Sequence, residues 1–309
     1  MISLFLPRSL VSVLGFIGLC VLITVAFSLM IPFILLKLLV PIPAWRSLCA
    51  GILIAIANAW VGANGIFLRT LYPINWRIEI NGTLDPKRSW LLICNHQSWV
   101  DIVLLFDVLH GRAPFPRFFL KDQLKYVPII GQACWALDFP FMKRHTKESL
   151  KKNPALRDQD LETTRRMCTK YRERPATVVN FLEGTRFTEA KRVSRGSPYR
   201  HLLRPKSAGM SFALNAMGDQ FAGIIDVSIA YQPSRHSLVG GFLRGEQNDL
   251  VIHIDVLPVP TEHLGGDYQG DAAFRMRFQQ WINTLWTRKD KRLDTLAGSA
   301  HGEARPHTV

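Results

Sequence analysis

The stretch Asn-His-Gln-Ser-Trp-Val-Asp, residues 95–101, follows an apolar run and gathers side chains that could perform acid–base chemistry. His96 and Asp101 are five residues apart, so one continuous helix would point them to different sides. Ser98 favours a helix start, and Asp101 completes a Ser-x-x-Asp capping box whose carboxylate reaches back to the preceding loop. At such a junction the carboxylate can hold one imidazole nitrogen and leave the other free as a base. The stretch alone also fits a capping box with an incidental histidine.

A second polar stretch, Asn-Phe-Leu-Glu-Gly-Thr-Arg-Phe, occupies residues 180–187. A run rich in β-formers ends there in a turn at Gly184. This turn presents backbone N–H groups, the hydroxyl of Thr185 and the guanidinium of Arg186, which are groups that bind a phosphate or a carboxylate. The same residues also fit a surface turn in which Arg186 pairs with Glu183.

Beyond Trp76 the sequence alternates strand-like apolar runs with helical patterns. This alternation predicts an α/β fold with a mixed, largely parallel sheet flanked by helices. Ligands of such sheets bind beyond the carboxyl ends of the strands. Lys121 and Arg144 each follow an expected strand, as His96 does, and Lys206 precedes an expected helix start, which favours anions. The pattern therefore predicts a site for an anionic substrate.

The expected strands cover residues 76–80, 90–94, 118–120, 136–142, 176–181, 224–231 and 250–259. The expected helices cover residues 99–109, 161–172, 207–217 and 272–295. In the last helix a stripe of large apolar side chains favours packing on the core over a second membrane contact. These elements predict three parts: membrane-anchoring helices over 1–75, an α/β domain over 76–297 and a disordered tail over 298–309.

Two uncharged apolar stretches precede the domain, with 28 residues between Arg8 and Lys37 and 22 between Arg46 and Arg69. A helix that spans a bilayer needs about 20 apolar residues. The first stretch is too long for a signal-peptide core and lacks a small-residue cleavage site, so we expect a membrane helix. The second is milder and could span, re-enter or lie in the interface. The distribution of positive charge places the domain on the cytoplasmic side.

The chain has 309 residues, is 48% hydrophobic and carries a net charge of +14, which indicates anionic partners. Its basic residues are spread over loops and tails, which argues against nucleic-acid binding. The five cysteines form no C-x-x-C pair, which indicates a reducing compartment rather than a disulfide framework or a zinc site. The sequence has no G-x-S-x-G elbow, Walker A loop or H-E-x-x-H spacing, which argues against a serine hydrolase, a P-loop nucleotide site and a zinc site of these types.

Five blocks of the sequence resemble the glycerolipid acyltransferases, the group that includes the lysophosphatidic acid acyltransferases. NHQSWVD resembles the family's H-x-x-x-x-D motif, and FLEGTRF resembles its F-P-E-G-T-R-S motif with Leu182 and Phe187 in place of proline and serine. FLKDQLKYVPIIG, FPFMKR and LLRPKSAGM are similar to three further family blocks, and Arg144 matches the arginine of the second. The blocks occur in family order over about residues 91–229. The chain looks most like bacterial inner-membrane members near the lysocardiolipin acyltransferase branch.

This resemblance implies a membrane-bound enzyme that moves a fatty acyl group from acyl-CoA or acyl carrier protein to a lysophospholipid hydroxyl. 1-Acyl-glycerol-3-phosphate is the first expected acceptor, and lysocardiolipin or another lysophospholipid is the alternative. His96 would be the general base and Asp101 its support. The implied location is a bacterial inner membrane, with no metal, cofactor or nucleic acid involved. The expected substrate-binding residues are Asn95, Lys121, Arg144, Glu183, Gly184, Thr185, Arg186 and Lys206.

Overall fold

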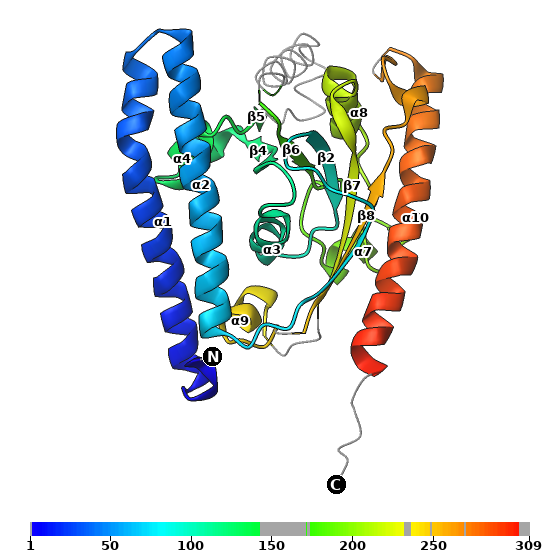
Figure 1. The fold of residues 1–309 in the computed structure, drawn as a ribbon. Helices are drawn as coiled ribbons and strands as arrows, with labels where there is room; N and C mark the ends of the chain where they lie inside the picture. Colours follow the sequence, from blue (N-terminus) through cyan, green and yellow to red (C-terminus); the bar gives the residue numbers. More distant parts are fainter. Residues whose placement is uncertain are drawn as a thin grey trace.

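The structure is a computed structural model that describes residues 2–142, 171, 174–231, 236–247, 249–268 and 270–302 (Figure 1). After a short 3₁₀ turn (Ile2–Leu4), helices α1 (Arg8–Leu39) and α2 (Pro43–Leu71) form an antiparallel hairpin along one flank. By length and composition, both helices are long and apolar enough to cross a membrane. In their most apolar windows 33% of α2 is buried but only 6% of α1. The hairpin therefore packs through α2 and leaves the apolar surface of α1 open.

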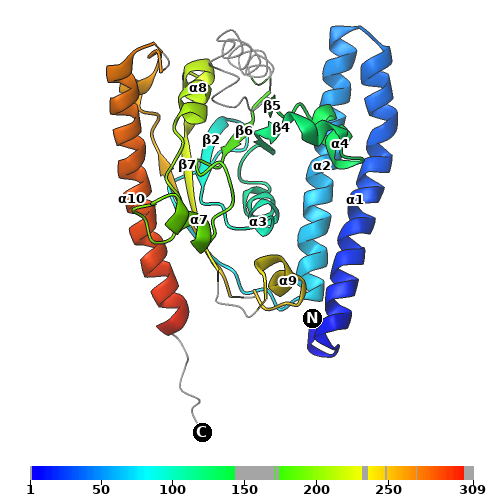
Figure 2. The ribbon, with the colours of Figure 1, turned by 180° about the vertical axis from the view of Figure 1, so that it is seen from behind.

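Both ends of α1 contact the α/β domain. Near its start Arg8 lies 3.5 Å from Glu246, and near its end the Lys37 ammonium donates to the Ala136 carbonyl (2.9 Å) and to Asp138 (3.1 Å). A helix of 32 residues is about 48 Å long, so α1 extends beside the domain over most of its height. Figures 1 and 2 show this arrangement from opposite sides.

Among the described residues, six strands form the main sheet in the order β1-β8-β7-β2-β6-β3. All neighbouring pairs are parallel except β7 and β8, which confirms the predicted mixed, largely parallel sheet. β2 is buried along its whole length, as its unbroken apolar run requires of a strand that is covered on both faces. The strands are β1 (Arg77–Asn81), β2 (Ser89–Cys94), β3 (Pro116–Phe118), β6 (Thr177–Asn180), β7 (Phe221–Ala230) and β8 (Val251–Leu257).

The two faces of the sheet carry two hydrophobic layers. Because side chains alternate along a strand, Leu92 and Cys94 of β2 face α3 (Val100–Leu109) and the hairpin, whereas Leu91 and Ile93 face the other side. That second side is covered by α8 (Ala208–Met217) and α10 (Ala272–Gly302) (Figure 2). The apolar stripe of α10 is thus part of the core, as predicted.

Two expected strands are wrong in detail. The run 118–120 is divided between β3 and β4 (Leu120–Lys121), which belong to different sheets. Of the run 136–142 only Phe141–Met142 forms a strand, β5, which pairs with β4. Residues before it end helix α4 (Ile130–Ala136), and Asp138 has a φ of +59°, which no regular strand allows.

Other differences concern segments without a predicted element. Short helices occur there: 3₁₀ turns at Asp122–Tyr126 and Thr261–His263, α7 (Glu189–Ser194) and α9 (Leu238–Leu243). The helix expected over residues 161–172 lies outside the described residues except for position 171. Helix α10 continues to Gly302, five residues into the range for which we predicted a disordered tail.

Candidate active site

His96 and Asp101 form a pair at the loop between β2 and α3. The Asp101 Oδ2 atom lies 2.8 Å from His96 Nδ1 and accepts backbone N–H groups from Gln97 (2.7 Å) and Ser98 (2.9 Å). The carboxylate is therefore directed back over the loop, as predicted, although the N-cap position of α3 is Trp99 rather than the expected Ser98. Ser98 Oγ accepts from Val100 N–H (3.2 Å), so Ser98 contacts both the start of α3 and the Asp101 carboxylate.

The geometry leaves one imidazole nitrogen for chemistry. With Nδ1 engaged by Asp101, His96 keeps Nε2, and its side chain is 16% exposed whereas that of Asp101 is fully buried. The imidazole ring stacks on Phe181, with 4.1 Å between ring centroids and 17° between planes. Contacts on two sides thus fix the ring orientation, which a positioned base needs.

Tyr231 is a third member of this group that the sequence did not suggest. Its hydroxyl donates to Asp101 Oδ1, the carboxylate oxygen that does not face His96. Burial raises the pKa of Tyr231 well above its usual value, so the phenol remains a donor. Tyr231 directly follows β7 and is 130 residues from Asp101, and no local pattern marks it.

Asn95 does not occupy a substrate-binding position. Its side chain is fully buried, with Oδ1 accepting from Ile229 N–H (2.9 Å) and Nδ2 donating to the Ile229 carbonyl (3.0 Å). The Asn95 amide therefore pairs with the Ile229 backbone as a neighbouring strand would, at the point where β2 ends beside β7. This contact corrects the expectation of a ligand contact and explains how the loop that bears His96 is fixed to the sheet.

Glu183 is likewise a positioning residue. It is fully buried, and its two oxygens accept the backbone N–H groups of His96 and Leu203, each at 2.8 Å. Burial raises its pKa to about 7, against the opposing effect of these two donors. The carboxyl group thus links the His96 loop to the segment before α8, and it corrects both the expected ligand role and the alternative of a surface pair with Arg186.

The turn that follows β6 lies beside the His96 loop. Phe187 N–H donates to the His96 carbonyl (2.6 Å), and the exposed Arg186 guanidinium lies 5.6 Å from the Trp99 ring centroid. Gly184 has a φ of +65°, which glycine adopts without strain. A Cβ at Gly184 would lie 3.2 Å from the Lys206 side chain, so Lys206 lies against the turn that bears Arg186.

Two further expected substrate-binding residues, Thr185 and Lys121, lie in surroundings other than those predicted, and a third is not described. Thr185 Oγ1 accepts from the Lys191 ammonium (3.2 Å), so its hydroxyl joins the turn to α7. Lys121 is exposed on β4, which pairs with β5 in a small sheet apart from the strand that precedes Arg186. Arg144 lies outside the described residues.

Comparison with known proteins gives the family. The family model described as Acyltransferase matches residues 77–232, which is about half of the chain and includes the sheet up to Tyr231. The chain belongs to the acyltransferase family.

Individual relatives agree with this assignment. Human 1-acyl-sn-glycerol-3-phosphate acyltransferase gamma is 28% identical over 214 residues, which cover 66% of this acyltransferase and 52% of the human protein. A 2-acyl-1-lysophosphatidylinositol acyltransferase of Saccharomyces cerevisiae is 24% identical over 268 residues, covering 72% and 65% of the two chains. The alignments thus span only about half to two thirds of these relatives.

A solved structure shares the fold. The 1-acyl-sn-glycerophosphate (LPA) acyltransferase PlsC of Thermotoga maritima superposes with a TM-score of 0.54 and 15% sequence identity, covering 93% of this chain and 98% of the other. The similarity therefore includes the N-terminal helices as well as the sheet.

An apolar cavity of about 380 Å³ adjoins the site of this acyltransferase. It is lined by residues of α1, α2, α3, α4 and α9, and Trp99 belongs to its wall. Since the Trp99 ring also lies beneath Arg186, the cavity and the cationic turn meet at one side chain. The volume is within the range of small-molecule sites in proteins.

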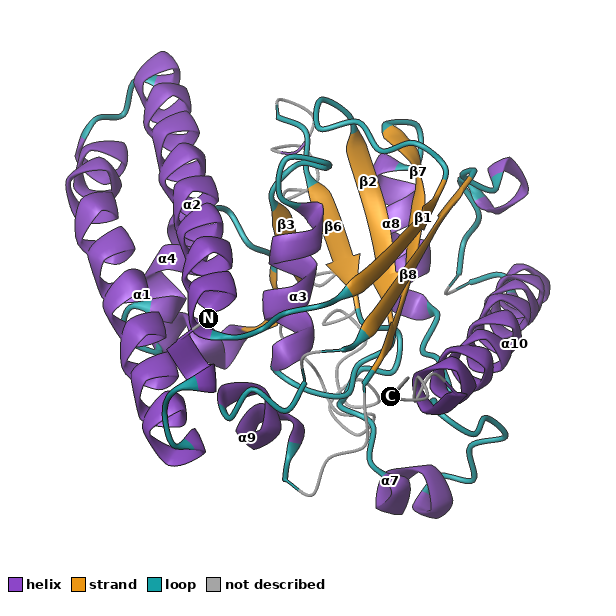
Figure 3. Ribbon diagram, turned by 60° about the horizontal axis from the view of Figure 1, so that its bottom comes forward, coloured by secondary structure: helices purple, strands orange, loops and turns teal. Residues whose placement is uncertain are grey.

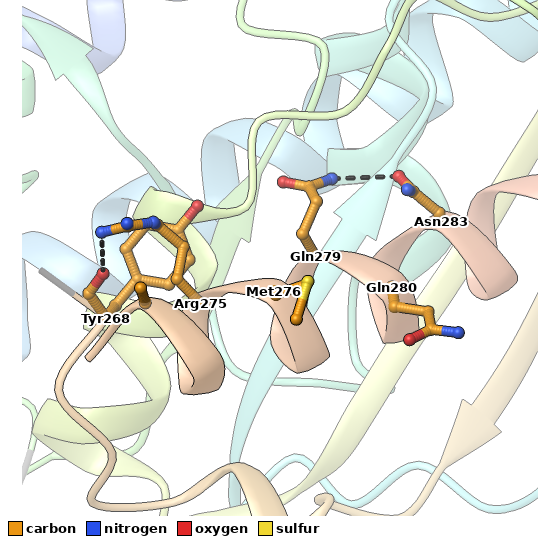
Figure 4. Close-up of a pocket in the computed structure, with 7 residues that line it drawn as sticks. Tyr268, Arg275, Met276, Gln279, Gln280 and Asn283 are labelled. Carbon is orange, nitrogen blue, oxygen red and sulfur yellow. Dashed lines mark hydrogen bonds between the residues drawn. The ribbon is translucent and has the colours of Figure 1, made fainter.

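A second hollow, of about 620 Å³, lies on the outer face of α10 (Figure 4). Its polar side chains bond to each other or to nearby backbone: Gln279 donates to Asn283 (3.0 Å), and Arg275 donates to the Tyr268 carbonyl (3.5 Å). All its lining residues come from α10 and the loop before it, so this hollow is separate from the His96 site. Among the described residues no group of three or more His, Cys, Asp or Glu could hold a metal ion.

Proposed function

We propose that this protein transfers a fatty acyl group from a thioester to the free hydroxyl of a membrane lysophospholipid, with 1-acyl-glycerol-3-phosphate as the first acceptor. The observation that carries the proposal is the 2.8 Å pair of His96 and Asp101 in a chain of the acyltransferase family. The names of two relatives, which act on lysophosphatidic acid and lysophosphatidylinositol, support a lysophospholipid acceptor.

In this proposal His96 is the general base. Its Nε2 takes the proton of the acceptor hydroxyl while the oxygen attacks the thioester carbonyl carbon. The tetrahedral intermediate then expels the thiolate, which receives that proton from the imidazolium. A positioned base contributes about 10²–10⁴-fold to such a step.

Asp101 supports the imidazolium that forms. Three N–H or O–H donors besides His96 hold its carboxylate, from Gln97, Ser98 and Tyr231. These contacts fix the carboxylate against rotation, so Nδ1 of His96 remains the protonated nitrogen and Nε2 the basic one.

The acceptor's phosphate would bind at the turn after β6. Arg186 and Lys206 are both exposed, Arg186 follows Gly184 by two residues and Lys206 contacts Gly184, so their charges could bind a phosphate at this turn. Lys121 and Arg144 stay predicted phosphate ligands. The apolar cavity behind Trp99 would accommodate part of an acyl chain.

We also propose that α1 lies in one leaflet rather than crossing the bilayer. Both ends of α1 contact the domain, so a crossing along its axis would place the domain's flank in hydrocarbon. An in-plane hairpin buries the open apolar surface of α1 and brings the His96 loop to the lipid. The proposed location is the cytoplasmic face of a bacterial inner membrane.

The test is acyl transfer by the purified full chain from acyl-CoA to 1-acyl-glycerol-3-phosphate. His96→Ala should lower kcat/KM at least 10²-fold, whereas His110→Ala, at an exposed histidine near the end of α3, should stay within two-fold. Thermal unfolding of both variants reports whether they fold. A folded His96→Ala variant with activity within a few-fold of the original chain contradicts the proposal. Lysocardiolipin and other lysophospholipids are assayed in parallel as alternative acceptors.

A further inference from the structure

The segment from Arg186 to Lys206 holds a disproportionate share of the protein's positive charge. Its 21 residues contain seven Lys or Arg and only one acid, Glu189, whereas the whole chain has a net charge of +14. Two of the seven, Arg186 and Lys206, border the turn beside His96. The other five form what we term the α7 surface together with Val193: Lys191, Arg192, Arg195, Arg200 and Arg204.

The α7 surface adjoins the site but lies away from the hairpin. The Lys191 ammonium donates to Thr185 Oγ1 (3.2 Å) and to the Arg186 carbonyl (2.8 Å), so α7 is fixed directly to the turn. In Figure 3, α7 projects beyond the carboxyl ends of the strands on the α10 side, opposite α1 and α2. A molecule bound at α7 would therefore approach His96 from the side opposite the proposed lipid surface.

This surface is ordered by its own contacts. Thr188 Oγ1 caps α7 by accepting from Lys191 N–H (3.3 Å), and Arg192 forms a short ion pair with Glu189 (2.5 Å). The Arg204 guanidinium donates to the Gly196 carbonyl (3.0 and 2.8 Å). On the α10 side, Arg200 pairs with Asp294 (3.1 Å), so Arg192 and Arg200 each already face one acid of this chain. These contacts hold the cations in place before a partner arrives, which lowers the entropic cost of binding.

An exposed apolar side chain stands among these cations. Val193 is 66% exposed on α7, between Arg192 and Arg195. A hollow of about 490 Å³ lies on the same segment, and its wall contains Arg192, Arg200 and His201 together with Phe187, Glu189, Pro198 and Tyr199. An apolar centre within a charged rim is the arrangement of a protein–protein interface. A nucleotide phosphate would contact the cations but not the apolar valine side chain.

We propose that the α7 surface docks an acidic carrier protein that delivers the acyl group as a thioester. This inference rests on the proposed function. Carboxylates of the carrier would face the cations of the α7 surface, and a small apolar patch would cover Val193. The carrier's thioester arm would then reach His96 past the turn at Thr185, while the acceptor arrives from the hairpin side.

The test compares two donors with the same acyl chain, acyl carrier protein and acyl-CoA, using the full chain and one acceptor, 1-acyl-glycerol-3-phosphate. The variant Arg195→Glu/Arg204→Glu reverses two exposed charges of the α7 surface, and Val193→Asp alters its centre. The control Lys87→Glu/Arg88→Glu makes the same charge change at exposed residues before β2, at the opposite end of the sheet.

We expect both α7 variants to raise KM for the carrier-protein donor at least ten-fold while kinetics with acyl-CoA stay within two-fold. The control should behave like the original chain with both donors. Raising salt from about 0.05 to about 0.2 M should raise KM for the carrier donor in the original chain and less in Arg195→Glu/Arg204→Glu.

Three outcomes overturn the inference: an equal loss with both donors, no change with the carrier donor, or transfer from acyl-CoA but none from the carrier protein in the original chain. The last outcome leaves the proposed function intact. Transfer from neither donor to any lysophospholipid acceptor contradicts the proposed function itself.

Discussion

The two flanks of the candidate site differ in almost every physical respect. On one side α1 and α2 present apolar side chains, and the cavity behind Trp99 is lined mainly by apolar residues. On the other side the α7 surface gathers five cations around one valine. His96 lies between them, at the loop that joins β2 to α3. Under the two proposals above, a lipid would approach His96 from the hairpin side and a water-soluble acidic donor would approach it from the α7 side.

The largest effect should come from the residue between the flanks. Asp101→Asn removes the negative charge beside the imidazolium, and its amide group must face at least one of the present donors. We expect kcat to fall at least 10²-fold with acyl-CoA and with acyl carrier protein alike. Steady-state kinetics with both donors measures this. A loss confined to one donor would mean that the pair does not serve both flanks.

Charges on the apolar flank should release the protein from lipid. Val21 and Val25 are exposed on α1, with more than half of each side chain accessible. Val21→Glu/Val25→Glu should move at least ten-fold more protein into the supernatant of sedimented phospholipid vesicles, since ionised groups are costly in hydrocarbon. The Arg195→Glu/Arg204→Glu variant should sediment like the original chain. Equal release of both variants would contradict the proposal that α1, rather than the α7 surface, contacts the lipid.

The turn at Arg186 should affect the acceptor more than the donor. Arg186→Ala removes one charge-assisted contact to the proposed phosphate, so we expect KM for 1-acyl-glycerol-3-phosphate to rise about ten-fold. The KM values for both donors should change less than three-fold. A larger change for a donor would assign Arg186 to the α7 side of the site.

The last prediction concerns stability rather than catalysis, at the loop that joins the flanks. The pKa of Glu183 is raised to about 7 in the folded chain by burial, so the folded state binds its proton more tightly than the unfolded state does. This contribution to stability is fully present below about pH 4.5 and is lost as pH rises through about 7. The loss is on the order of 3 kcal/mol in the free energy of unfolding.

Glu183→Gln should lack that pH-dependent contribution. Denaturant unfolding of both proteins in detergent at pH 5 and pH 8 measures this contribution. The change in the free energy of unfolding between the two pH values is compared in the two proteins, and the difference between these changes is due to Glu183. The variant should also be less stable at pH 5, since a glutamine has one oxygen for the two N–H donors of His96 and Leu203. Identical pH slopes would show that the raised pKa of Glu183 does not contribute.

The sequence predicted the parts of the fold that depend on local periodicity. β2, β7 and α8 are continuous apolar or helical patterns, and they form close to their expected bounds. The run 136–142 is just as apolar, but Asp138 at positive φ and Pro140 without an N–H interrupt it, and the chain forms a helix end and a two-residue strand instead. Hydropathy alone does not detect such interruptions.

The site shows the same division. The His96–Asp101 contact followed from a capping box within seven residues, whereas Tyr231 lies just after β7, 130 residues from Asp101, and has no sequence signal. Asn95 and Glu183 were predicted to bind substrate, but in the structure both side chains are buried and bonded to backbone groups. A buried side chain that holds backbone N–H groups and an exposed one that holds a ligand look alike in sequence.

The place of β8 in the sheet has a consequence for how the chain is made. β1, the strand that follows the hairpin, pairs with β8, and β8 pairs with β7. β1 and β8 are separated by about 170 residues of chain. Asn95 and Asp101 gain their contacts with Ile229 of β7 and with Tyr231 only when that later part of the chain is present. During synthesis the hairpin emerges from the ribosome first, long before β7 and β8. A nascent chain therefore exposes the hairpin well before Asn95 and Asp101 gain their partners at Ile229 and Tyr231.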